Sequence, residues 1–505
     1  MALLYRLPLL LLLTGLASVS MIVPASVALW GEAFQDARSF FYSGLIGVIF
    51  CLLVGFALAN RPHNRNAIRQ LLALLGSFVV LPAFLAVPFY ESVQTTSFLN
   101  AYLEMVSSLS TTGLPLFAPE RLSMAEHLWR AQVGWMGGLL MWVAAAAILA
   151  PLNLGGFEVT SLGEPGQDVV AGAARRDTAN PASRLARSAA VLVPAYALLT
   201  LALWVLLLVS GDTPFVALTH AMSVMSTSGI SPVGGTAGAE SGLAGEAIMA
   251  VFLLFALSRV TFSQDTSSSA QRAGLFYDPE FRLGLAIVLS VPTLLFLRHF
   301  VAALDIGDQN NIIAALRAFW GAAFTVLSFL TTHGFSSVDW VDAQAWSGLE
   351  TPGLILMGLA LIGGGVATTA GGVKLMRVFA LIMNGMREVD RLVHPSSIGR
   401  SGLVSRRTRR EGAFIAWVFF MIFAITLAAT TVVFAAFGIR FEQALVLAVA
   451  SLTNCGPLVD VVQAGRLTLI ELGPGPKAIA ALAMIMGRLE MLALVVILIP
   501  DLWRD

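Results

Sequence analysis

The chain has 505 residues, of which 57% are hydrophobic and 12% charged, and its mean hydropathy is +0.82. Soluble domains usually carry about 25% charged residues, so this composition excludes a soluble globular protein and indicates an integral membrane protein. The net charge is +0, which gives no indication of a nucleic-acid partner, and two cysteines, Cys51 and Cys455, provide no disulfide framework.

The first predicted element is an apolar helix over 8–30. Arg6 followed by the start of this run is also compatible with a cleaved signal peptide. The run continues to Trp30, however, and this length is sufficient to cross a bilayer, so a retained first helix is favoured. A second span is predicted over 41–59.

Further long apolar stretches bring the prediction to about ten membrane-spanning helices in an all-α polytopic protein. They cover 70–89, 129–151, 188–210, 243–262, 283–304, 350–385, 412–438 and 477–500. Four apolar stretches between these spans are too short to cross a membrane, and each is a candidate re-entrant helix. They lie at 98–111, 214–227, 317–332 and 441–454.

The distribution of arginine predicts the orientation of these spans, because cytoplasmic segments of membrane proteins are enriched in Lys and Arg. The segment 386–411 is the most basic of the connecting segments. With both termini in the cytoplasm, more than half of the basic residues lie on the cytoplasmic side. All four re-entrant stretches then lie on the outer side. The basic segment 386–411 is either a docking surface for a regulatory partner or simply a result of the positive-inside bias.

The four re-entrant stretches align with one another on a single glycine, and this internal repeat is the most informative feature of the sequence. The aligned glycines are Gly113, Gly229, Gly334 and Gly456. Twelve residues earlier each copy has an alanine: Ala101, Ala217, Ala322 and Ala444. Six residues earlier each has a small residue: Ser107, Ser223, Ser328 and Ala450. The repeat predicts two N-terminal helices in 1–69 and four helix–pore helix–helix units in 70–187, 188–282, 283–411 and 412–505.

Small residues also mediate close helix packing in lipid, and this is the main structural alternative. It does not explain a coincident glycine in four stretches that are each too short to cross. Irregular backbone at membrane depth is tolerated where it lines a cavity, and four such loops can replace the water shell of a cation with carbonyl oxygens. The C-terminal ends of the short helices would favour a cation there. The repeat therefore predicts an ion filter.

Residues 363–372 interrupt the predicted span 350–385 with five glycines, so we expect the helix to break there and to face a cavity. Lys374 follows this loop, and Arg488 lies in the last predicted helix. Bases within the membrane indicate a functional site, here a barrier across the pore. The alternatives are a packed Arg488–Glu490 neighbourhood and a Lys374 that extends to the cytoplasmic interface.

The sequence resembles the superfamily of bacterial Trk/Ktr and plant HKT potassium transporters. Its two extra N-terminal helices resemble the TrkH branch. The resemblance covers nearly the whole chain from about residue 70. It rests on Glu104 to Leu114 (EMVSSLSTTGL), Thr331 to Ser336 (TTHGFS), Asn454 to Pro457 (NCGP), Gly363 to Arg377 (GGGVATTAGGVKLMR) and Gly487 to Leu492 (GRLEML).

The resemblance implies four units around a pseudo-fourfold pore, with potassium ions bound by filter carbonyls. These carbonyls would belong to Thr111, Thr112, Gly113, Thr227, Ser228, Gly229, Thr332, His333, Gly334, Asn454, Cys455 and Gly456. The implied gate comprises Gly363, Gly364, Gly365, Thr368, Thr369, Gly371, Gly372, Lys374 and Arg488. Glycine at all four filter positions implies a preference for potassium.

The resemblance also implies potassium uptake across the cytoplasmic (inner) membrane by a homodimer. A cytoplasmic nucleotide-binding ring of the TrkA type would regulate it, so that nucleotide binds only to that separate subunit. Membrane lipid is the remaining expected partner, and we expect no covalently bound cofactor and no nucleic acid.

Several residues depart from the family pattern and bear on selectivity. The second filter, Ser226 to Gly235 (STSGISPVGG), lacks the usual adjacent glycines followed by Phe-Ser, and Leu458 replaces a usual glycine. His333 stands where threonine is common; its ring either packs behind the filter or, if protonated, makes transport sensitive to pH. Three acids follow the filters and either attract cations or are ordinary solvated charges: Asp339, Asp342 and Asp460.

Other function classes fit the sequence less well. The histidines show no ligand-spaced cluster, and neither a nucleophile motif nor a phosphate loop is present, so an enzyme is not expected. An inverted-repeat transporter predicts halves of opposite topology, whereas these four units share one orientation. Less selective transport of potassium and sodium, and a non-conducting scaffold or sensor on the same fold, remain alternatives.

Overall fold

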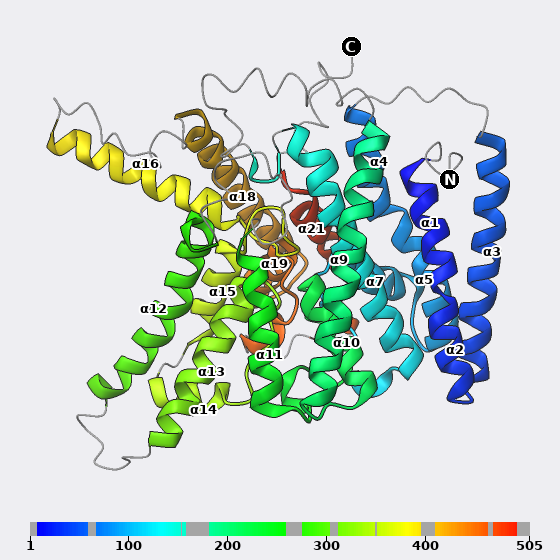
Figure 1. The fold of residues 1–505 in the computed structure, drawn as a ribbon, viewed down its shortest axis with the longest axis horizontal. Helices are drawn as coiled ribbons and strands as arrows, with labels where there is room; N and C mark the ends of the chain where they lie inside the picture. The colour runs from blue at the N-terminus through cyan, green and yellow to red at the C-terminus, as the bar shows by residue number, and fades with distance from the viewer. Residues whose placement is uncertain are drawn as a thin grey trace.

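A computed structural model gives the fold and describes residues 8–58, 67–152, 154–157, 181–258, 275–302, 312–348, 351–394, 410–462 and 468–491. Regular structure in these ranges is entirely helical. Figure 1 shows most of the long helices running in roughly the same direction, side by side, as expected for a polytopic membrane protein. The two chain termini, 1–7 and 492–505, lie outside the described residues.

The N-terminal part consists of α1 (Leu9–Ser20), α2 (Ile22–Trp30) and α3 (Phe34–Leu58). The first two follow one another as a single apolar span, Leu9–Trp30, and both pack on α3. They form one edge of the molecule in Figure 1. The two predicted N-terminal spans are thus present.

The rest of the chain runs four times through a long helix, a helix that ends at a motif glycine, and a further helix. The first unit contains α4 (Ala67–Val79), α5 (Leu81–Val93), α6 (Phe98–Leu109) and α7 (Met124–Ala144), and the second contains α9 (Pro181–Val209), α10 (Pro214–Ser226) and α11 (Gly242–Leu254). The third contains α12 (Pro279–Ala302), α13 (Ile312–Leu330), α14 (Trp340–Ser347), α15 (Gly353–Ile362) and α16 (Leu375–Val393). The fourth contains α18 (Arg410–Ala436), α19 (Phe441–Thr453), α20 (Leu458–Val461) and α21 (Pro474–Leu489). The predicted unit boundaries stay a prediction.

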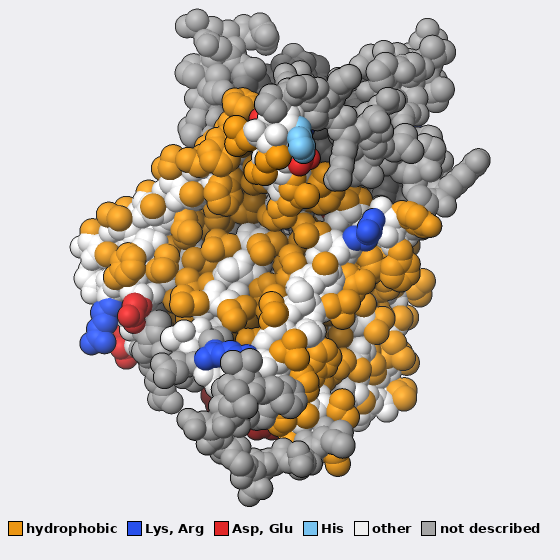
Figure 2. All heavy atoms as spheres, turned by 90° about the vertical axis from the view of Figure 1, so that its left-hand side faces the viewer, with side chains coloured by type: hydrophobic (Ala, Val, Ile, Leu, Met, Phe, Trp, Pro, Cys, Tyr) orange, Lys and Arg blue, Asp and Glu red, His pale blue; other side chains and the backbone are white. Residues whose placement is uncertain are grey.

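Among the described residues, 8 helices are long and apolar enough to cross a membrane. They are Leu9–Trp30, Phe34–Leu58, Gln70–Val93, Met124–Leu152, Arg184–Val209, Pro279–Arg298, Ile313–Leu330 and Gly412–Ala436. Figure 2 shows a broad hydrophobic surface with charged side chains toward its margins. Many large hydrophobic side chains are exposed, such as Phe414 and Ile425 of α18, as expected of a lipid-facing surface.

Two elements have other bounds than expected. The third re-entrant helix was expected over 317–332, whereas α13 begins earlier, at Ile312, and its 19 residues are by length and composition sufficient to span. The segment 386–411 was expected to be a loop, but α16 continues to Val393. Figure 1 shows α16 extending away from the other helices. Residues 395–409 of that segment lie outside the described residues.

The hydrophobic core positions the site. One buried cluster joins the N-terminal helices to α6, α7 and α21, and a second joins α9–α13 and α15. Both clusters include residues of α19, and the ends of all four short helices are buried between them. The motif glycines therefore lie in the interior, surrounded by spanning helices.

Candidate functional site

Each of the four helices α6, α10, α13 and α19 ends three or four residues before its motif glycine, and the backbone turns in a similar way each time. The residue two positions before the glycine has a left-handed conformation, with φ of 57° at Thr111, 51° at Thr227, 57° at Thr332 and 54° at Asn454. This conformation is uncommon for a β-branched threonine. Strained backbone of this kind tends to cluster at functional sites.

One hydrogen bond recurs in all four loops and confirms the register of the sequence alignment. The residue before the glycine donates its N–H to the carbonyl of the small residue five positions earlier. The four bonds join Thr112 to Ser107 (2.8 Å), Ser228 to Ser223 (3.0 Å), His333 to Ser328 (2.9 Å) and Cys455 to Ala450 (3.0 Å). The shared spacing of small residues thus corresponds to a shared backbone turn at the end of each helix.

The four loops contact one another in chain order and close into a ring. A Cβ atom on Gly113 would lie 1.9 Å from the carbonyl oxygen of Ser228, and one on Gly229 would lie 2.4 Å from that of His333. Pro457 follows at 3.1 Å from the corresponding position on Gly334, and Gly456 contacts Gly113. Only glycine fits at Gly113, where the contact is this close and φ is +64°. Loops far apart in sequence therefore surround one axis.

The fourth loop differs from the others. Gly456 does not have a positive φ, and its N–H donates to the Thr112 carbonyl at 2.6 Å. The side-chain amide of Asn454 donates to Thr112 Oγ1 (2.9 Å) and to the Met484 carbonyl (3.0 Å). One expected filter carbonyl is thus already hydrogen-bonded to the neighbouring loop, and α21 is tied to the ring.

The residue immediately before each glycine is buried in all four loops. Hydroxyl pairs lie there in the first two loops, Ser110 with Thr112 at 2.7 Å and Ser226 with Ser228 at 3.0 Å. His333 takes this position in the third loop, where its fully buried ring lies 4.2 Å from that of Phe335, centroid to centroid. The ring therefore packs behind the loop, which is the first of the two alternatives for this histidine.

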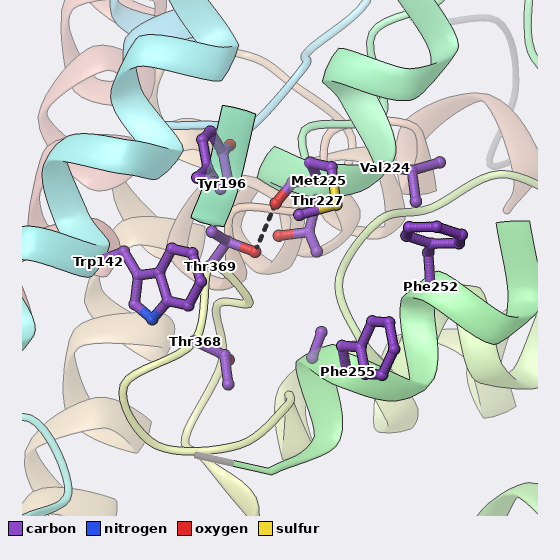
Figure 3. A pocket seen from close by; sticks show the side chains of 10 residues that line it. Trp142, Tyr196, Val224, Met225, Thr227, Phe252, Phe255, Thr368 and Thr369 are labelled. Carbon is purple, nitrogen blue, oxygen red and sulfur yellow. Dashed lines mark hydrogen bonds between the residues drawn. The ribbon is translucent and has the colours of Figure 1, made fainter. Parts of the chain in front are cut away.

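The glycine-rich segment breaks the helix as expected, because α15 ends at Ile362 and α16 begins at Leu375. The intervening loop lies directly against the ends of the short helices. Thr369 Oγ1 donates to the Met225 carbonyl at 3.2 Å (Figure 3), and the Gly371 N–H donates to Thr332 Oγ1 at 2.7 Å. A Cβ on Gly371 would lie 2.0 Å from the Thr453 carbonyl oxygen. The loop thus contacts three of the four repeats.

Two buried bases hold this loop. Arg488 donates from Nη1 to the Thr369 carbonyl at 2.6 Å, and Lys374 donates from Nζ to the Ala370 carbonyl. Their exposed fractions are 4% and 8%. Lys374 therefore does not extend to the interface. Glu490 pairs with Arg377, and the alternative interpretation, in which Arg488 packs as the partner of Glu490, therefore does not describe the hydrogen bonding of Arg488.

Sequence reasoning missed the partners beneath the loop. Arg377 donates from Nη2 to Glu490 Oε2 at 2.6 Å, and its guanidinium lies 3.7 Å from the ring centroid of Phe419. Glu280 of α12 accepts from the Val366 N–H at 3.1 Å. Arg377 and Glu490 both lie inside the motifs quoted above. Their charge within apolar segments was the signal that could have identified them.

A small cavity lies beside the glycine-rich loop, beneath the turn of the second loop (Figure 3). Trp142 and Tyr196 line one side and Phe252 and Phe255 the other. Thr368 and Thr369 project into it from the glycine-rich loop. The cavity thus lies between the glycine-rich loop and the end of α10.

The three acids that follow the filters occupy different environments. Asp339 is buried, Asp342 is exposed, and Asp460 is exposed on α20 directly after the fourth loop. Partial desolvation by the surrounding protein raises the pKa of the Asp460 carboxyl to about 6. Among the described residues no group of three or more His, Cys, Asp and Glu side chains is arranged to hold a metal ion.

Spanning helices, buried helix ends that meet in a ring, and a broken helix beneath them together define a polytopic membrane protein of the transport class. The TrkH family model, described as a cation transport protein, matches residues 247–504. The chain belongs to the TrkH family.

Individual relatives match over most of the chain. It is 29% identical to the Trk system potassium uptake protein TrkH of Vibrio parahaemolyticus over 500 residues, 98% of each chain. It is 30% identical to the Trk system potassium uptake protein TrkH of Halomonas elongata over 441 residues, 86% of this chain and 84% of that one. The crystal structure of the potassium transporter TrkH from Vibrio parahaemolyticus superposes with a TM-score of 0.78 at 27% sequence identity and covers 100% of both chains.

Proposed function

We propose that this chain takes up potassium ions across the cytoplasmic membrane through the ring of four loops. The observation that carries this proposal is the cyclic contact of the loops, with a glycine-rich loop pressed against their inner ends. Relatives named as potassium uptake proteins support the choice of ion. Potassium is then the transported ion and not a resident cofactor.

The filter consists of backbone carbonyls, and the side chains of the motif serve to position them. Its members are Thr111, Thr112, Gly113, Thr227, Ser228, Gly229, Thr332, His333, Gly334, Asn454, Cys455 and Gly456. Carbonyl oxygens replace the hydration shell of the ion, and the C-terminal ends of α6, α10, α13 and α19 add a negative potential. The Thr112 carbonyl would become available only when its bond from the Gly456 N–H is exchanged for an ion.

The gate comprises the loop between α15 and α16 together with Arg488 of α21. Its members are Gly363, Gly364, Gly365, Thr368, Thr369, Gly371, Gly372, Lys374 and Arg488. In the observed arrangement the loop lies under the ring and is held by the Arg488 and Lys374 side chains. Permeation requires these contacts to break, and the positive charges of both bases oppose a cation in their vicinity.

The working protein is a homodimer in the inner membrane, with N- and C-termini in the cytoplasm. A TrkA-type ring that binds nucleotide docks on the cytoplasmic side, and membrane lipid surrounds the exposed apolar helices. The printed names of the relatives refer to a Trk system, which supports a multi-component assembly. An enzymatic activity is not part of the proposal, since the relatives are transporters.

A second candidate, less selective transport of potassium and sodium, has two observations in its favour. Loop two departs from the family sequence, and the loop-four glycine lacks the positive φ of the other three. Both features can alter the spacing of carbonyls on which selectivity depends. A non-conducting scaffold or sensor on the same fold is the third candidate.

The test is ion flux into proteoliposomes that contain the purified chain, with potassium, rubidium and sodium compared and Gly113→Ser as the paired variant. Fluxes of potassium and rubidium well above that of sodium, with weaker discrimination in the variant, are the expected result. Equal sodium flux would favour the less selective transporter. Absence of any flux, also with the cytoplasmic regulator added, would favour the non-conducting scaffold.

A further inference from the structure

The irregular segment that follows the third filter loop is held by side chains from two helices, α11 and α13, and from a neighbouring loop. The Ser337 N–H donates to Thr325 Oγ1 at 3.1 Å, and the Asp339 N–H donates to Ser337 Oγ at 3.1 Å. The Ser336 carbonyl accepts from Thr236 Oγ1 at 2.5 Å. Buried backbone groups outside regular structure require such partners. The remaining hydrogen-bond donors of this segment bind a carboxylate from another helix.

Glu246 of α11 supplies that carboxylate, and its side chain is completely buried. Its Oε1 accepts from the Val338 N–H at 2.6 Å. Its Oε2 accepts from Ser337 Oγ at 2.7 Å and from Trp320 Nε1 at 2.9 Å. No lysine or arginine pairs with it among the described residues. A buried charge is tolerated when its hydrogen bonds are satisfied, and here three donors converge on two oxygens.

The other loops are anchored differently. In the first loop, the residue after the glycine, Leu114, donates its N–H to Ser107 Oγ at 2.7 Å. The equivalent Ser328 hydroxyl of the third loop makes no hydrogen bond in the described part of the chain. The fourth loop continues into α20 with its own helical bonds, such as Val459 N–H to the Gly456 carbonyl at 3.1 Å. The third loop therefore lacks the hydroxyl anchor of the first loop, and besides the bond to Thr325 of its own repeat it is anchored to Glu246 of α11.

We propose that Glu246 is a positioning residue for the third filter loop and helps to determine ion selectivity. Val338 lies only four residues after Gly334, so a displaced anchor moves the carbonyls of Thr332, His333 and Gly334. Discrimination between ions depends on where such carbonyls lie. This inference rests on the proposed potassium transport through the ring.

The variant E246Q tests the hydrogen bonds specifically. The amide of glutamine offers one acceptor oxygen and one donor nitrogen. In either orientation the nitrogen faces an obligate donor, the Val338 N–H or the Trp320 indole N–H. Adding W320F removes the indole donor. The glutamine can then accept from Val338 and donate to the Ser337 hydroxyl, which rotates to accept.

We expect E246Q to lower the ratio of potassium to sodium flux in proteoliposomes by roughly three- to tenfold, the usual scale for a buried polar group left without a partner. We expect E246Q/W320F to restore the ratio to within about twofold of wild type. The matched control is E126Q, because Glu126 is also buried but caps the first turn of α7, and its hydrogen bonds among the described residues go to Ser92 and Ser123. Its ratio is expected to be unchanged.

An unchanged ratio in E246Q would overturn the inference. A lowered ratio that W320F does not restore would also overturn it, because the charge and not the hydrogen bonds would then matter. Should E246Q fail to fold, E246D replaces it. The aspartate keeps the charge, but its shorter side chain cannot reach both the Val338 N–H and the Trp320 indole N–H. An unchanged ratio of potassium to sodium flux in E246D would then overturn the inference. Amide hydrogen exchange of residues 335–339, compared between wild type and E246Q, measures the anchoring of this segment independently of transport. If the wild type transports no potassium, the proposed function is refuted, and the exchange comparison still tests the role of Glu246.

Discussion

Arg377 and Glu490 form a buried ion pair, with 2.6 Å between Nη2 and Oε2, that joins the start of α16 to the end of α21. Both residues flank the elements assigned to the gate, since Arg377 lies three residues after Lys374 and Glu490 two after Arg488. The aromatic ring of Phe419 on α18 covers the other face of the guanidinium. The pair thus fixes three helices around the glycine-rich loop.

Removing one partner of this pair should be far more harmful than removing both charges. The exposed fractions of the two side chains are 0% and 8%, so R377M leaves a buried carboxylate without its partner. We expect a loss of about 3 kcal/mol in the free energy of unfolding, seen as a lower thermal denaturation midpoint in detergent. R377M/E490Q should recover most of this loss. A double variant no more stable than R377M would contradict the assignment.

Thr332 and Thr111 occupy equivalent positions but differ in their contacts, which offers a matched test of the gate. Thr332 Oγ1 accepts from the Gly371 N–H, whereas Thr111 Oγ1 has no hydrogen-bond partner within the described residues. T332V should loosen the loop and raise potassium flux in the absence of a regulator by roughly threefold, the scale of one hydrogen bond. T111V, measured in the same flux assay, should behave as wild type. Equal effects in both would argue against a latch at Thr332.

Gly113 should tolerate a side chain poorly, while Gly358, a helical glycine of α15, should tolerate one. G113A places a methyl group 1.9 Å from the Ser228 carbonyl oxygen in a residue with φ of +64°. We expect lower potassium flux with weaker discrimination against sodium, and a free energy of unfolding lowered by at least about 1 kcal/mol. A Cβ on Gly358 of α15 meets nothing within 4 Å, so G358A is the control and should retain both properties. Normal flux in G113A would refute the close approach of the first two loops.

Asp460 should make cation entry dependent on external pH. Because desolvation raises its pKa to about 6, the carboxyl is ionised above this value and attracts cations, and it becomes neutral below it. Potassium uptake from dilute solution at low ionic strength should fall by roughly twofold as the external pH drops from about 7 to about 5. D460N should show the low value throughout.

The control for this pH dependence is D342N, which removes an exposed acid after the third loop. It should keep the decline between these pH values. A decline that persists in D460N would assign the titration to another group.

Much of the fold could be predicted from local sequence. The apolar run that ends at Trp30 and the glycine cluster beginning at Gly363 each act over one helix length, because hydrophobic length and backbone conformation are local properties. The spacing of Ser107 and Gly113, and of their counterparts, likewise predicted a common turn, and the hydrogen bond from Thr112 to Ser107 confirms it. Element ends were less certain, as the early start of α13 and the helical Val393 show.

The pairing of buried polar groups depended on the tertiary structure. Sequence proximity placed Glu490 beside Arg488, whereas the fold pairs it with Arg377 and directs Arg488 to the Thr369 carbonyl. Glu246 reads as an isolated charge in an apolar helix, and its role depends on donors from α13 and from beyond Gly334. Which segments are apolar and where the backbone must turn could be read from the sequence alone. The choice of partner for each buried charge followed from packing, because such a group pairs with whichever donor or acceptor the assembled helices bring near, and an atom that meets none, such as Nε of Arg488, makes no hydrogen bond among the described residues.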